Sequence, residues 1–78
     1  MTPYTERLMV TPNPAQASLQ SLQSAWPDID VMLQFGRDAR GGERLLITLT
    51  GLQSERVELA RDAWLTALAA SGVRAFVV

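Results

Sequence analysis

Hydrophobic residues in this chain recur with the period of a strand in some segments and with the period of a helix in others. The order of these segments constrains the fold more than any other feature of the sequence. Alternation of apolar and polar residues, the pattern of a half-buried strand, is clearest over Asp28–Phe35. Apolar residues at helical spacing occupy Pro14–Trp26 and Glu55–Ser71. The remaining strand-like segments are Thr5–Val10, Leu45–Thr50 and Val73–Val78. The resulting order is strand, helix, strand, strand, helix, strand.

Residues that favour turns and helix ends separate these segments. Pro27 is expected to end the first helix, because the residue before a proline avoids helical angles. Asn13 and Ser54 are suitable N-caps for the two helices. The polar, glycine-rich segment Gly36–Arg44 predicts a loop that joins two antiparallel strands. Gly72 is expected to follow the second helix in a left-handed conformation.

Two strand–helix–strand units in 78 residues form one domain, residues 1–78. Because crossover connections of this kind are right-handed, both helices are expected on the same face of a four-stranded sheet. The predicted fold class is α+β. It is a ferredoxin-like βαββαβ two-layer sandwich whose antiparallel sheet has the strand order 4-1-3-2.

The sheet face opposite the helices would have no covering element from this chain. Soluble monomers rarely keep a large exposed apolar patch, so we predict that this face binds a second copy, giving a homodimer or small homo-oligomer. The predicted interface residues are Met9, Met32, Leu46, Arg74 and Phe76. The other residues expected on this face are Arg7, Gln34, Thr48 and Val78. The alternatives are a mildly apolar face that stays solvated, or a register that is slipped at one strand.

The last predicted strand is apolar up to Val78. At a sheet edge, such a strand would be poorly protected against pairing with another chain. The alternative is that its last residues fray.

The residue types that are missing exclude several chemistries. The chain has no Cys, no His and no Lys. Without Cys it forms no disulfide and no thiolate metal site, and without His it cannot build a Ser–His–Asp triad. Without Lys, a Schiff base or a P-loop lysine is impossible. We therefore predict that the chain is not an enzyme and binds no cofactor or metal.

The sequence also bears on location. It contains no apolar run of 18 residues or more, so we expect no membrane span. The segment MTPYTERLMV lacks the basic and apolar regions of a signal peptide. The expected location is the cytoplasm.

The segment Gly36–Arg44 is the densest polar stretch of the chain. Arg37, Arg40 and Arg44 could together bind phosphate, although neighbouring acidic residues offset part of their charge. The net charge of −1 argues against general nucleic-acid binding, which needs an excess of basic residues. A solvated loop is the simpler interpretation. Single-stranded nucleic-acid binding through these arginines is the alternative function.

Three further pairs of residues are interpreted as structural. The two aspartates provide too few ligands for a hard cation. The two tryptophans have the spacing of core residues, and the glutamate and arginine have the spacing of an exposed pair on one helix. These pairs are Asp28 with Asp30, Trp26 with Trp64, and Glu58 with Arg61.

The segment Leu45–Leu68 resembles the closing half of a KH domain, a family that binds RNA. An apolar strand ends in Gly51, and a helix follows it with apolar residues at the family's positions. With the preceding strand and loop as the family's second strand and variable loop, the resemblance covers residues 28–68. The family grips nucleic acid through a Gly-x-x-Gly loop, and residues 12–27 contain no glycine. The resemblance therefore implies a degenerate KH-like domain, to which no binding residues are carried over. The positions that carry the resemblance are Ile47, Leu49, Gly51, Val57, Ala60 and Leu68.

Overall fold

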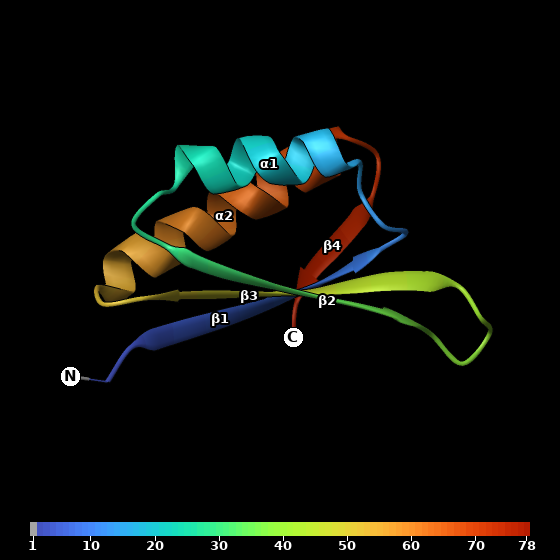
Figure 1. Cartoon of the computed structure of the whole chain (residues 1–78), viewed down its shortest axis with the longest axis horizontal. Helices are drawn as coiled ribbons and strands as arrows, with labels where there is room; N and C mark the ends of the chain where they lie inside the picture. The colour runs from blue at the N-terminus through green and yellow to red at the C-terminus, as the bar shows by residue number, and fades with distance from the viewer. Residues whose placement is uncertain (1) are drawn as a thin grey trace.

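The computed structural model describes residues 2–78, which form one four-stranded sheet with two helices. In chain order, the elements are β1 (Tyr4–Thr11), α1 (Gln16–Ala25), β2 (Asp30–Arg37), β3 (Glu43–Gly51), α2 (Ser54–Ala70) and β4 (Arg74–Val77). All neighbouring strands are antiparallel, in the order β2-β3-β1-β4. This is the predicted order 4-1-3-2 in reverse. Both helices lie on the same side of the sheet (Figure 1), so the ferredoxin-like α+β fold is confirmed.

The core lies between the helices and the sheet face that they cover. Inward-facing residues of β1 and β3 are directly opposite each other, as in the pairs Leu8 with Ile47 and Val10 with Leu45. Burial of an aliphatic side chain of this size contributes about 1.5–3 kcal/mol. The buried core residues are Leu8, Val10, Leu19, Ile29, Leu45, Ile47, Leu49, Val57, Ala60, Trp64 and Leu68.

The two helices contribute unequally to this core. The 17-residue α2 buries four side chains, whereas the 10-residue α1 buries only Leu19 fully. Trp64 is fully buried, as expected, but Trp26 is only partly buried. Phe35 shares the helix side of the sheet with Leu33, yet it is 62% exposed. It lies near the end of the edge strand β2, where it lines a groove together with residues of α1.

The predicted helix caps are wrong at both N-termini. Ala15 occupies the N-cap position of α1 and Gln53 that of α2, and neither helix has a side-chain cap. Asn13 lies two residues before the α1 cap, and Ser54 is already inside α2. A cap contributes about 1 kcal/mol, less than the burial of Leu19, so packing against the sheet sets where α1 begins.

Strands β2 and β3 extend further into the predicted loop than the sequence indicated, which leaves only residues 38–42 between them. The Asp38 carboxylate accepts hydrogen bonds from the backbone N–H groups of Arg40 (2.9 Å) and Gly42 (2.8 Å). Gly41 has a φ of 82°, in the left-handed region. An aspartate that bonds to the backbone and a glycine with positive φ together close this turn. Gly72 has a φ of 85°, which confirms the predicted conformation after α2.

Candidate functional site: the uncovered sheet face

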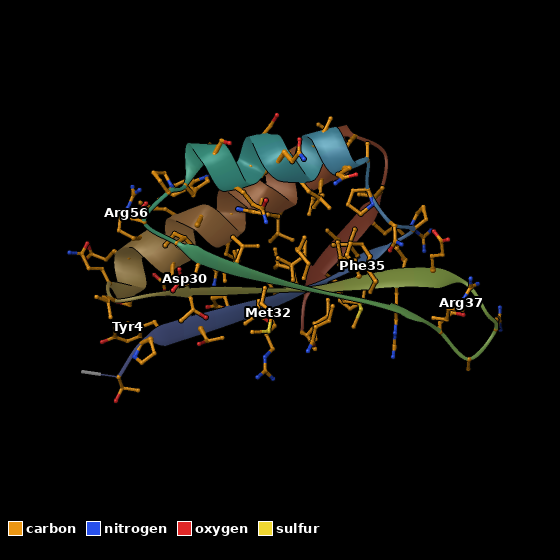
Figure 2. All side chains as sticks on the ribbon, in the orientation of Figure 1. Tyr4, Asp30, Met32, Phe35, Arg37 and Arg56 are labelled. Atoms are coloured by element: carbon orange, nitrogen blue, oxygen red, sulfur yellow. The ribbon has the colours of Figure 1, made fainter. Side chains whose placement is uncertain are left out.

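The sheet face opposite the helices presents rows of side chains that cross all four strands. The strand register aligns Gln34, Leu46, Met9 and Phe76 in one row, with one residue from each strand. The next row holds Met32, Thr48 and Arg7. Val78 continues it, because its N–H donates to the carbonyl oxygen of Arg7 at 3.0 Å. Figure 2 shows Met32 on the side of the sheet that faces away from the helices.

The centre of this face is apolar and open to solvent. Met32 is 59% exposed and Phe76 is 54% exposed. Met9 and Leu46 lie between them and are half-buried. Together with Arg74, which lies opposite Thr11 at one end of the face, these are the five predicted interface residues. The structure therefore places all five on one continuous surface, which we call the open face.

The charges of the open face are unbalanced. Arg7, Arg44 and Arg74 lie on it, against a single acidic residue, Asp30. A Cβ atom at Gly36 would lie 3.7 Å from Nε of Arg44, so the Arg44 side chain lies over Gly36. None of these four charged side chains forms an ion pair within residues 2–78. Their charges are therefore available to a partner.

The three arginines of the predicted anion site do not converge. Arg37 lies on the helix side of the β2–β3 hairpin and donates from Nη1 to the carbonyl oxygen of Gly41 at 3.0 Å. Arg44 lies on the opposite face. Arg40 is in the turn, where its backbone N–H is held by Asp38. Only Arg44 joins the open face. Its position depends on how far the hairpin extends, which the glycine-rich sequence did not indicate.

A second polar cluster lies where the segment before β2 meets the start of α2. Arg56 donates from Nε and Nη2 to the two carboxylate oxygens of Asp28, at 2.8 and 2.9 Å. Its guanidinium lies 4.6 Å from the centre of the Trp26 ring. The hydrogen bond from Arg56 lowers the pKa of Asp28 and raises that of Arg56. Each charged group is satisfied by the other, so we interpret this cluster as a structural contact that holds α2 against the segment before β2.

Two of the predicted charge pairs are arranged differently in the structure. Asp28 precedes β2, which starts at Asp30, so the two aspartates do not lie side by side on a strand. Arg61 pairs with Glu6 of β1 at 3.0 Å and with Asp62 at 3.1 Å, rather than with Glu58. The Glu6 contact joins α2 to the sheet, and helical spacing alone cannot indicate it.

Within residues 2–78, no group of three or more His, Cys, Asp or Glu side chains comes together as a metal ligand set. No helix in the same range is long and apolar enough to cross a membrane.

Comparisons with known proteins identify the fold. No family model matches the chain, and no curated protein matches it. Prephenate dehydratase from Streptococcus mutans matches over 94% of this chain and 40% of its own, with 20% identity and a TM-score of 0.56. The intact alpha subunit of aIF2 from Pyrococcus abyssi matches over 99% of this chain and 33% of its own, with 14% identity and a TM-score of 0.58.

At these identities the likeness concerns the fold alone, and the chain spans less than half the length of either protein. The resemblance to KH domains stays a prediction. The chain is an α+β domain of ferredoxin-like fold.

Proposed function

We propose that this chain is a non-enzymatic assembly domain whose open face binds the open face of a second copy. The exposed apolar centre of that face, formed by Met9, Met32, Leu46 and Phe76, carries the proposal. These side chains come from all four strands and face away from both helices. Packing them against the same patch of a second copy would remove both patches from water, which favours association.

The dimensions of the open face suit a weak specific dimer. Three strands with about seven paired residues each and β4 with four, at about 3.4 Å per residue and about 4.8 Å between strands, cover about 410 Å² in plan. Two copies together bury at least twice that area, and the relief of the side chains adds to it. The sum approaches the lower limit of about 1,200 Å² for stable specific interfaces. We therefore expect a dimer whose population depends on concentration in the micromolar range.

The arginines of the open face are compatible with such a contact. Arg7 and Arg74 are both exposed. A long arginine side chain can lay its methylene groups on an apolar surface while its guanidinium reaches water. In a face-to-face dimer we assign Arg7 and Arg74 to polar contacts around the apolar centre.

Substitution of Phe76 by Asp tests this function. Phe76 is 54% exposed, so the monomer does not need it for its core, but in the dimer the new carboxylate would be buried against apolar side chains. We expect Phe76→Asp to weaken dimerisation at least tenfold, measured by sedimentation equilibrium and native mass spectrometry over a concentration series. Leu59→Asp is the matched control, because Leu59 is also 54% exposed but lies on α2. The comparison is made in a Phe35→Lys background, which leaves the open face intact because Phe35 lies on the other side of the sheet. Equal dimer dissociation constants with and without Phe76→Asp in that background would refute the proposed interface.

Single-stranded nucleic acid is the second candidate partner, and one observation favours it. Arg44 joins Arg7 and Arg74 on a face that also exposes the ring of Phe76. Cations combined with an exposed aromatic ring are the usual means of binding single strands. The two candidates differ in their response to salt, because a phosphate backbone bound by arginines is released as salt rises.

A further inference from the structure

Strand β2 is an edge strand with little protection against pairing. The two edges of the sheet are β2 and β4. Natural proteins protect sheet edges with short strands, charged residues, prolines or bulges. The β4 strand is only four residues long, whereas β2 has eight, and the six residues between Asp30 and Arg37 carry neither charge nor proline. The β2 edge therefore offers an uninterrupted set of backbone groups to another strand.

The hairpin determines which backbone groups point outward from β2. The N–H of Asp38 donates to the carbonyl oxygen of Gly42 at 2.8 Å, next to the first pair of the β2–β3 register. In an antiparallel ladder, hydrogen-bonded and non-hydrogen-bonded pairs alternate, so the even-numbered residues of β2 bond to β3. The N–H and C=O groups of Val31, Leu33 and Phe35 therefore point away from the sheet.

We propose that two copies of this chain pair antiparallel along β2, around a two-fold axis that passes between their Leu33 residues. This arrangement would join the two sheets into one of eight strands. It pairs the outward backbone groups of Val31 with those of Phe35 in the second copy, and Leu33 with its own counterpart. Both copies keep their helices on the same side of the joined sheet, so odd-numbered residues must lie opposite odd-numbered ones and even-numbered residues opposite even-numbered ones. The proposed register satisfies that condition.

The side chains on the helix side of β2 fit this arrangement. The exposed ring of Phe35 would lie opposite Val31 of the second copy, and the half-buried Leu33 would meet its own counterpart. In the single chain, Leu33 and Phe35 line a groove of about 380 Å³ beneath α1. The sequence of α1 contains no charged residue, so two copies of this helix can approach above the seam without repulsion. The groove side of α1 presents Gln16, Gln20 and Gln23.

Charges on the open face select the same register. Asp30 would lie opposite Gly36 of the second copy, which is where the Arg44 side chain of that copy lies. The two-fold axis produces this Asp30–Arg44 contact twice. A register shifted by two residues in one direction would place Asp30 opposite Asp38 of the second copy, where the two carboxylates would repel each other. The opposite shift would leave Gly36 without a partner within β2. The first register therefore joins opposite charges and pairs most of the strand.

This proposal is independent of the open-face dimer and can be separated from it by mutation. Phe35 and Phe76 lie on opposite faces of the sheet and on opposite edge strands. The edge contact is therefore measured in the Phe76→Asp background, in which association through the open face is removed. We expect that variant to form a dimer through β2, and a protein that stays monomeric up to millimolar concentration would overturn the edge proposal.

Substitution of Phe35 by Lys in this background is the first test. The side chain is 62% exposed, so the fold should persist, while a lysine in the middle of the edge would oppose pairing. We expect the dimer dissociation constant to rise at least tenfold in sedimentation equilibrium. Leu59→Lys in the same background is the control and should leave the constant unchanged. Equal constants for the two variants would overturn the proposal.

Exchange of the paired charges tests the register. Asp30→Arg and Arg44→Asp should each weaken the dimer, and the double variant should recover most of the affinity. Asp30 and Gly36, over which Arg44 lies, are six residues apart along β2, or about 20 Å. Recovery would therefore come from contacts between copies rather than within one. If the loss of dimer affinity in the double variant equals the sum of the losses in the two single variants, this register is excluded.

Amide hydrogen exchange measured by NMR gives a readout that depends only on the backbone. In a dilute sample of the monomer, the amides of Val31, Leu33 and Phe35 should exchange quickly, whereas those of Met32 and Gln34 are protected by β3. As the dimer forms, the odd-numbered amides should become protected. Fast exchange of these amides at concentrations where the mass is that of a dimer would show that the copies associate elsewhere.

Discussion

Single charged residues in this chain act by joining elements that are distant in sequence. Arg56 connects α2 to Asp28 and lies over Trp26, and Arg61 connects α2 to Glu6 of β1. Trp64 could be identified as a core residue from its helical spacing, because a helix presents one face to the sheet. The partners of Arg56 and Arg61 could not be identified in that way, since they depend on which strand lies beneath each turn of α2.

The Asp28–Arg56 pair predicts a pH dependence of stability. Hydrogen bonding by Arg56 lowers the pKa of Asp28 below its ordinary value of 3.8, while the unfolded chain keeps the ordinary value. The carboxylate therefore stabilises the fold above about pH 4, and this contribution is lost as the pH falls through the lower pKa of the folded state. We expect Asp28→Asn to lower the melting temperature at pH 7, with a smaller difference from the wild type at pH 2–3.

Thermal melts followed by circular dichroism, with both proteins compared at each pH, would measure this effect. Asp62→Asn is the control for a general change in surface charge, because Asp62 contacts Arg61 on its own helix. A difference between Asp28→Asn and wild type that does not change with pH would contradict the assigned role of the carboxylate.

At the scale of elements, the strands and helices follow from periodicity, whereas their ends follow from packing. All six elements occur where the sequence predicted them, with boundaries that move by one or two residues. The two N-caps were wrong because neither helix has a side-chain cap. Phe35 lies on the same face as Leu33, as the alternation over Asp28–Phe35 indicates, but it stays 62% exposed at the sheet edge. Alternation alone cannot show how far a covering helix reaches.

Gly51, at the end of β3, shows how closely the elements pack. A Cβ atom there would lie 2.9 Å from Cγ2 of Val57 and 3.0 Å from Cδ1 of Ile29, both of which are core residues. We expect Gly51→Ala to destabilise the fold by about 1–3 kcal/mol, the usual range for overpacking a core, as measured by urea denaturation. Gly36→Ala is the matched strand control, because its Cβ would meet only Nε of Arg44 at 3.7 Å. Equal stability of the two variants would show that the end of β3 can move away from α2.

At the scale of the whole molecule, charge is distributed unevenly about a net value of −1. The open face carries three arginines and one aspartate, whereas the exposed side of α2 carries acidic residues. The apolar part of the open face could be predicted from alternation and strand order together. Its charge could not, because Arg44 was assigned to a loop. The exposed acidic residues of α2 are Glu55, Glu58 and Asp62.

This distribution gives the two candidate functions opposite responses to salt. Two open faces, each with three positive charges against one negative, repel each other when they meet. Because the Debye length falls from about 10 Å at 0.1 M salt to about 3 Å at 1 M, added salt should tighten a face-to-face dimer. Single strands bound by three arginines would instead lose affinity, with a log–log slope of about −2, since each neutralised phosphate contributes about −0.7.

Sedimentation equilibrium and fluorescence anisotropy with a labelled oligonucleotide, each from 50 mM to 1 M NaCl, would measure the two responses. The Phe35→Lys background removes association through β2 from both measurements. We expect the dimer dissociation constant to fall as salt rises, and any oligonucleotide affinity to be weak even at 50 mM. A dimer that weakens with salt would mean that opposite charges, rather than the apolar centre of the open face, hold the copies together. Strong oligonucleotide binding with the steep slope would assign the open face to nucleic acid.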